Sequence, residues 1–142
     1  MNAVVYVSKS GNTKKLSDVI AQAIGVDAQA IGNGVNLAQI DLLFIGASIY
    51  AGKIDSALRK FLQSLTPKQV AKAVVFGTSM SGKSALAEIK SILEPKGIPV
   101  CGEAFQCKGA FLWFNRGHPD AGDMSRAADF ARNICAKSGV QA

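Results

Sequence analysis

Five segments of the chain are short and predominantly apolar, and in the four strongest of them polar residues do not alternate with apolar ones. Four are strong, at residues 3–7, 41–46, 73–76 and 99–105, and a weaker one spans residues 26–31. Strict alternation would indicate strands with one face in water, whereas continuous apolar segments of this length are typical of strands covered on both faces. We therefore expect a sheet that is buried between two layers.

Between these segments, apolar residues recur every three or four positions, which predicts helices. Helices are expected at residues 13–24, 55–65, 84–93 and 124–136. Asn12 or Thr13 is a candidate cap for the first helix and Asp55 for the second, because short polar side chains can accept the free N–H groups of a first helical turn. The fourth strong strand should be less regular than the others, because it contains Pro99 and Gly102.

Strands that alternate with helices predict a parallel sheet, because parallel neighbours need a long, right-handed crossover. The expected fold class is α/β, with a five-stranded parallel sheet in a three-layer α/β/α arrangement. No linker, internal repeat or low-complexity segment divides the sequence, so we expect a single domain over residues 1–142.

Composition limits where a protein of this fold could be located and what it could bind. No apolar stretch approaches the roughly 20 residues of a membrane-spanning helix, and no charged leader precedes the first apolar segment, so we expect a cytoplasmic protein. The three cysteines match no zinc-binding spacing and are expected to be reduced, so no metal site is predicted.

The net charge of +6 suits an anionic ligand or an acidic partner. The positive charges are scattered and not interleaved with aromatic residues, which disfavours nucleic acid.

Three segments rich in small and hydroxyl residues directly follow predicted strands, at residues 8–13, 47–53 and 77–83. In an open parallel sheet, ligands bind at the carboxyl ends of the strands, so these segments are expected to form one site. The first contains a glycine turn, three hydroxyl residues and an asparagine just before a helix, and no carboxylate. A helix start with free N–H groups and neutral side-chain donors predicts a site for a phosphate monoester.

The third segment also matches a different phosphate motif. Residues Gly77 to Ser84 fit the pattern G-x-x-x-x-G-K-S of nucleotide triphosphatases, between an apolar segment and a helix. Such enzymes also need an acidic residue at the end of a neighbouring strand to hold magnesium. Only one strong strand follows Lys83, and its acid, Glu103, lies in the middle of that strand. The triphosphatase remains an alternative, but the residues favour a chance match.

The chain resembles the flavodoxin family over essentially its full length. The segment VVYVSKSGNTKKLSDVIAQAI is similar to the family's first strand and its [ST]-x-[ST]-G-N-T phosphate loop. DLLFIGASIYAGKIDSALRKFL is similar to its third strand, flavin-contacting loop and following helix, and GHPDAGDMSRAADFARNI to its last helix. This resemblance implies the strand order 2-1-3-4-5, an FMN cofactor and an electron-transfer function.

The resemblance also implies which residues bind the cofactor. One loop would hold the phosphate and two would flank the isoalloxazine ring, through Ser8, Lys9, Ser10, Gly11, Asn12 and Thr13; Ser48, Ile49, Tyr50, Ala51, Gly52 and Lys53; and Thr78, Ser79, Met80, Ser81 and Gly82. Tyr50 is expected to stack on one face of the ring, and Met80 to pack on the other. No catalytic residue is assigned, and His118 is interpreted as a structural loop residue.

The basic charge departs from the acidic character typical of flavodoxins. It predicts redox partners with an acidic docking surface and a less negative flavin potential than an acidic site would give. The apolar segment Phe111–Phe114 is either folded against the sheet edge or exposed for a partner or quinone. We expect a monomer or a weak dimer.

Two other functional classes stay open. IGASIYAGKIDSAL also looks like menaquinone-dependent protoporphyrinogen oxidase, so an FMN-dependent oxidoreductase acting on a quinone or porphyrinogen is the first alternative. The second is a binding module that has lost the flavin.

Overall fold

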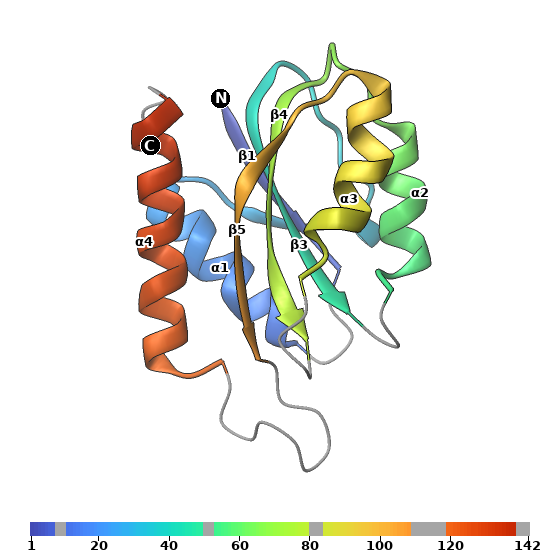
Figure 1. Cartoon of the computed structure of the whole chain (residues 1–142). Helices are drawn as coiled ribbons and strands as arrows, with labels where there is room; N and C mark the ends of the chain where they lie inside the picture. The colour runs from blue at the N-terminus through green and yellow to red at the C-terminus, as the bar shows by residue number, and fades with distance from the viewer. Residues whose placement is uncertain (8–10, 50–52, 80–83, 109–118, 139–142) are drawn as a thin grey trace.

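The parallel sheet predicted from the apolar segments is present in the computed structural model, which describes residues 1–7, 11–49, 53–79, 84–108 and 119–138 (Figure 1). Its strands are β1 (Asn2–Tyr6), β2 (Ala28–Ala30), β3 (Ile40–Ile49), β4 (Val70–Ser79) and β5 (Val100–Lys108). Its helices are α1 (Asn12–Ile24), α2 (Ser56–Ser64), α3 (Leu86–Leu93) and α4 (Ala121–Ser138), with 3₁₀ turns η1 (Ile31–Asn33) and η2 (Glu94–Lys96).

Every strand pairing in the described part of the chain is parallel, and the order is β2-β1-β3-β4-β5, which confirms the predicted order. The chain moves outward from β1 to β2 and then crosses back to β3, on the other side of β1. The carboxyl ends of β1 and β3 therefore mark the switch in strand order, where α/β sheets of this kind form a ligand crevice.

The sheet has a separate apolar core on each face. Leu58 and Leu62 of α2 and Ile89 and Leu93 of α3 belong to one core, while α1 and α4 supply side chains to the other. Ala127 and Ala131 of α4 are fully buried, and such small side chains allow close approach to the neighbouring helix α1. The helix layers thus cover both faces, as the continuous apolar segments indicate.

The carboxyl ends of β3, β4 and β5 extend past the expected segments. β3 and β4 continue to Ile49 and Ser79, three residues past the apolar segments, because Ser48 and Thr78 pair in register and are both buried. β5 has a register irregularity between its pairings at Val100 and Ala104, which agrees with the irregular strand expected around Gly102.

Two predicted helix caps have different outcomes. The side chain of Asp55 caps α2, because its Oδ1 accepts the backbone N–H of Ala57 at 2.7 Å. The prediction for α1 was wrong: its cap is Gly11, in the left-handed conformation with φ +86°, and Asn12 and Thr13 are its first two helical residues. Both residues are buried at the start of the helix.

All three cysteines are free thiols; Cys107 and Cys135 are buried, and Cys101 is partly buried. Burial raises the pKa of Cys107 to about 12, and Asp123 acts in the same direction. Burial also raises the pKa of Cys135. These thiols therefore stay protonated in the folded protein at pH values where an unfolded cysteine, with a pKa of about 8.5, ionises.

This difference predicts a loss of stability at alkaline pH. Between about pH 8.5 and 12 the unfolded state releases the Cys107 proton while the folded state keeps it, so the free energy of unfolding should fall as pH rises. Urea unfolding from pH 7 to 10.5 measures the fall. Cys107→Ala should make it shallower, whereas Cys101→Ala, at a partly exposed position, should not. Equal slopes for the wild type and Cys107→Ala would contradict the prediction.

Candidate functional site

Three buried hydroxyl groups meet where α1 begins and where β3 and β4 end. Oγ1 of Thr13 lies 2.5 Å from Oγ of Ser48 and 3.1 Å from Oγ1 of Thr78, and the Ser48 and Thr78 oxygens are 3.5 Å apart. The exposed fractions of these residues are 0%, 7% and 3%. We call these three residues the hydroxyl cluster. Each comes from a different one of the three predicted loops, so the structure joins those loops at one point.

The sheet register explains this convergence. Ser48 and Thr78 are cross-strand partners, and they lie on the same sheet face as Phe44 and Phe76, which pack in the core beneath α1. Gly46 lets the helix approach: a methyl group there would lie 2.7 Å from the ring of Phe76 and 3.0 Å from Oγ of Ser17. The start of α1 therefore lies against the ends of both strands.

The start of α1 has the properties of an anion site. Gly11 turns the chain into the helix, and the first turn contains no acidic residue. Among the described residues, no atom lies within 4 Å of the position that a methyl group on Gly11 would take. The first N–H groups of a helix carry partial positive charge and lack helical partners. These N–H groups are neutral donors of the kind that bind a phosphate group, and the hydroxyl cluster, whose oxygens bond to one another, lies beside them.

Glu88 holds the segment that follows β3. This residue lies in the first turn of α3, and its Oε1 accepts the backbone N–H of Ile54 at 3.0 Å. Its Oε2 accepts from the guanidinium of Arg59 in a partly buried ion pair. Ile54 is buried and Lys53 is exposed. The carboxylate thus ties the end of the second predicted loop to the helix that follows the third.

The predicted site residues fall into two groups. Among the described ones, Gly11, Asn12, Thr13, Ser48, Ile49, Thr78 and Ser79 lie at the carboxyl ends of the strands or the start of α1, and Lys53 follows shortly after β3. The others lie outside the described residues: Ser8, Lys9, Ser10, Tyr50, Ala51, Gly52, Met80, Ser81 and Gly82. The same holds for Lys83, Phe111–Phe114 and His118.

The sequence interpretation missed Ser17 and Glu88. Oγ of Ser17 donates to the carbonyl of Thr13 at 2.7 Å, four residues earlier in α1. Ser17 is fully buried beside Leu16 and Ile20, and a polar residue on an apolar helix face is a signal that could have identified it. For Glu88 no local sequence signal exists, because its partners Ile54 and Arg59 lie about thirty residues away.

Neither a metal-binding cluster nor a membrane-spanning helix is found in the described ranges. No three His, Cys, Asp or Glu side chains there are grouped so as to bind a metal ion. No helix in those ranges is both long and apolar enough to cross a membrane.

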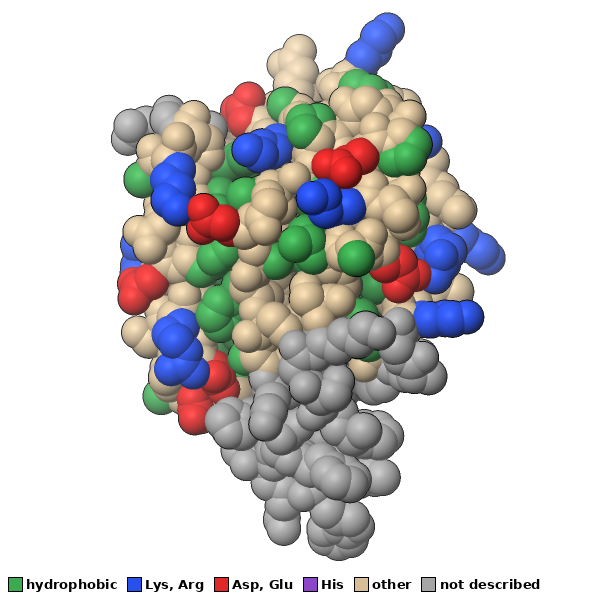
Figure 2. Space-filling model, in the orientation of Figure 1, with side chains coloured by type: hydrophobic (Ala, Val, Ile, Leu, Met, Phe, Trp, Pro, Cys, Tyr) green, Lys and Arg blue, Asp and Glu red, His purple; other side chains and the backbone are tan. Residues whose placement is uncertain are grey.

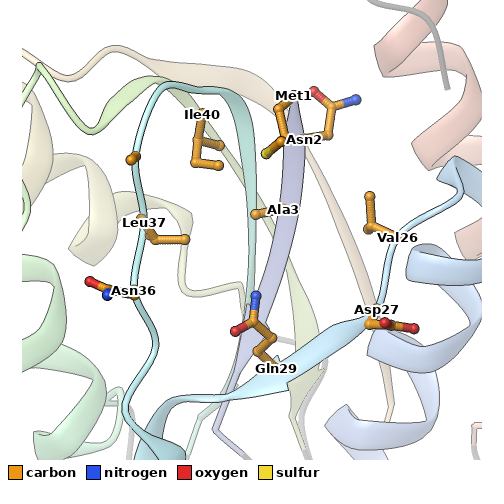
Figure 3. A pocket seen from close by; sticks show the side chains of 10 residues that line it. Met1, Asn2, Ala3, Val26, Asp27, Gln29, Asn36, Leu37 and Ile40 are labelled. Atoms are coloured by element: carbon orange, nitrogen blue, oxygen red, sulfur yellow. The ribbon is translucent and has the colours of Figure 1, made fainter.

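A hollow of about 700 Å³ lies at the opposite, amino end of the sheet (Figure 3). Ala3, Leu37 and Ile40 form apolar parts of its lining, and Gln29 and Asp27 polar parts. Met1, which carries the amino terminus, and the amide residues Asn2 and Asn36 also line it.

Comparisons with known proteins agree with this geometry. A family model described as a flavodoxin domain matches residues 3–97. An uncharacterised protein of Methanocaldococcus jannaschii is 31% identical over an alignment of 140 positions, gaps included, and the alignment covers 87% of this chain and 89% of the relative.

Solved structures with the same fold include a flavodoxin from the domain Archaea, with a TM-score of 0.75 and 21% identity over 96% of this chain and 98% of that one. A variant flavodoxin of Fusobacterium nucleatum bound to flavin mononucleotide has a TM-score of 0.64 and 18% identity, with 92% of each chain covered. At these identities, the solved structures establish the fold alone. The family model covers more than half of the sequence, and the chain belongs to the flavodoxin domain family.

Proposed function

We propose that this protein binds FMN and carries electrons between redox partners. The observation that carries the proposal is the hydroxyl cluster, which joins the start of α1 to the ends of β3 and β4. A similar fold has been solved with flavin mononucleotide bound. The donors at the start of α1 match a terminal phosphate, which FMN has and riboflavin lacks.

In this proposal, the segment from Ser8 to Thr13 holds the phosphate. The segments Ser48–Lys53 and Thr78–Gly82 flank the ring, with Tyr50 stacked on one face and Met80 packed on the other. Bound flavin supplies the redox chemistry, since it accepts and returns electrons; the protein binds it, orients it and sets its electrostatics. Lys53, exposed just after β3, would stabilise negative charge on the reduced ring and raise its potential.

The visible spectrum of the purified protein tests the central claim. A flavin spectrum in a one-to-one ratio supports it, whereas a colourless protein that takes up no flavin would point to a binding module. Turnover with quinones, protoporphyrinogen or NAD(P)H separates an enzyme from a carrier, because a carrier exchanges electrons only with redox proteins and artificial donors.

Two substitutions separate the proposed phosphate site from the triphosphatase alternative. Thr13→Ala should weaken FMN binding by about 1–2 kcal/mol, because a hydrogen bond to a charged group is lost. Thr13→Ser keeps the hydroxyl and should retain most of the affinity. Lys83→Ala should leave FMN affinity nearly unchanged. Isothermal titration with FMN measures all three, and ATP hydrolysis that disappears in Lys83→Ala would overturn the proposal.

A further inference from the structure

Glu88 connects two parts of the chain that are far apart in the sequence. Its two carboxylate oxygens have different partners: Oε1 accepts the backbone N–H of Ile54 at 3.0 Å, and Oε2 accepts from the guanidinium of Arg59 in α2. Ile54 lies just before α2, and its side chain is buried in the core that also contains Ile89 of α3. Ile54 is therefore bound to α3 through its backbone and shares a core with α3 through its side chain.

The ion pair of Glu88 is more sheltered than the others in the described part of the chain. The side chains of Arg59 and Glu88 are 39% and 22% exposed, whereas each of the other described pairs has at least one partner that is more than half exposed. Basic and acidic side chains are interspersed over the visible face of the molecule (Figure 2). Ion pairs at such a surface contribute little to stability. Removing the Glu88 carboxylate instead leaves a partly buried N–H group without its acceptor, which costs more.

The contact between Glu88 and Ile54 joins the ends of two segments that the proposed function places beside the flavin ring. The last residues of β3 and β4 are register partners, so both segments begin side by side. Residues 50–53 then lead from β3 to Ile54, and residues 80–84 lead from β4 to the N-cap of α3. Because Glu88 binds Ile54 to the first turn of α3, the two segments also end close together. A short segment with both ends fixed has fewer conformations than one with a free end.

We propose that Glu88 is a positioning residue for the flavin ring: by holding the Ile54 N–H, its Oε1 keeps residues 50–53 in the conformation that contacts the ring. The inference rests on the proposed function, in which these residues flank the ring. Glu88 acts through Ile54 and touches no part of the cofactor itself. When the contact is lost, flavin binds only the fraction of molecules in which the segment is still correctly placed, so the apparent affinity falls by that fraction.

Glu88→Met tests the proposal, because it keeps a side chain of similar length and removes both acceptor oxygens. It should weaken the binding of FMN and of riboflavin by the same factor, about tenfold, because the two ligands share the ring and one hydrogen bond is lost. Glu88→Gln keeps an oxygen for the Ile54 N–H and should stay within about twofold of the wild type. Titration followed by flavin fluorescence measures each Kd.

Arg59→Met is the matched control. It breaks the same ion pair but leaves the acceptor for the Ile54 N–H in place, so flavin affinity should again stay within about twofold of the wild type. Urea unfolding of each variant measures the accompanying change in stability. If either Glu88→Gln or Arg59→Met weakens flavin binding as much as Glu88→Met, the Ile54 contact is not the cause, and the proposal is overturned.

Two further measurements separate positioning from a general loss of stability. In full-length protein without added flavin, amide hydrogen exchange at Ile54 should be faster in Glu88→Met than in Arg59→Met. In flavin-loaded protein, the midpoint potential of Glu88→Met should shift toward that of free FMN, because a protein changes this potential only through contacts that favour one oxidation state of the ring. A decrease in stability alone would leave the potential of the bound flavin unchanged.

The wild type keeps two failures apart. If it binds FMN, and Glu88→Met has the same affinity and potential as the wild type, the positioning role is wrong while the proposed function stands. Failure of the wild type to bind FMN would overturn both.

Discussion

FMN should bind this protein at least about a hundredfold more tightly than riboflavin. The two molecules share the ring and differ at the phosphate, so their affinity ratio isolates the phosphate site. Each hydrogen bond to a charged phosphate oxygen contributes about 1.5–3 kcal/mol, and two such bonds correspond to a hundredfold or more. The first backbone N–H groups of α1 can offer at least that many donors.

Isothermal titration with FMN, riboflavin, FAD and ATP measures this ratio. FAD should bind less tightly than FMN. Its phosphate is a diester linked to an adenosine phosphate, whereas the start of one helix suits the terminal monoester of FMN. ATP should not displace FMN. If riboflavin binds as tightly as FMN, the assignment of the phosphate site is wrong. Tight binding of ATP would favour the triphosphatase alternative.

The architecture could be predicted because its signal is local. Segments such as 41–46 and 73–76 are apolar throughout, and that pattern requires cover on both faces of the sheet. The helices between them carry apolar residues at helical spacing, and parallel connections have one preferred hand. The strand order was implied by the resemblance and not by these patterns, because no local feature of the sequence specifies which strands are neighbours.

The strand ends could not be predicted for a physical reason. Ser48 and Thr78 look like loop residues, yet both are buried strand residues, because each hydroxyl finds a partner across the sheet and at Thr13. Their burial depends on residues 30 to 65 positions away. The same is true of Glu88 and Ile54. The sequence could identify the loops that form the site but not the contacts that hold them together.

Gly77 is the position where a single methyl group should have the largest effect on stability. Gly77 of β4 pairs with Ala47 of β3, and a Cβ on Gly77 would lie 1.9 Å from the carbonyl oxygen of Ala47 and 3.0 Å from its carbon. Both atoms belong to the backbone, so they cannot move aside as a side chain can. Gly77→Ala must separate the two strands, and we expect it to lower the free energy of unfolding by about 3 kcal/mol or more.

Gly77→Ala should also disturb the proposed cofactor site. Ser48 and Thr78 follow Ala47 and Gly77 in the register, so strand separation should pull apart the hydroxyl cluster and weaken FMN binding in any molecules that still fold. Gly77 is also the first glycine of the triphosphatase-like string, and close packing of β3 and β4 accounts for a glycine there without a nucleotide.

Gly102→Ala is the matched control for Gly77→Ala. It adds the same methyl group to another strand glycine, in β5, where a Cβ would meet no atom within 4 Å. Its backbone is not in the left-handed region, so the change should alter stability by less than about 1 kcal/mol. Urea unfolding of both variants, with FMN titration of each, compares them directly. If Gly77→Ala were as stable as Gly102→Ala, the close approach of β3 and β4 at the site would be wrong, and the proposed coupling between strand packing and cofactor binding would be lost with it.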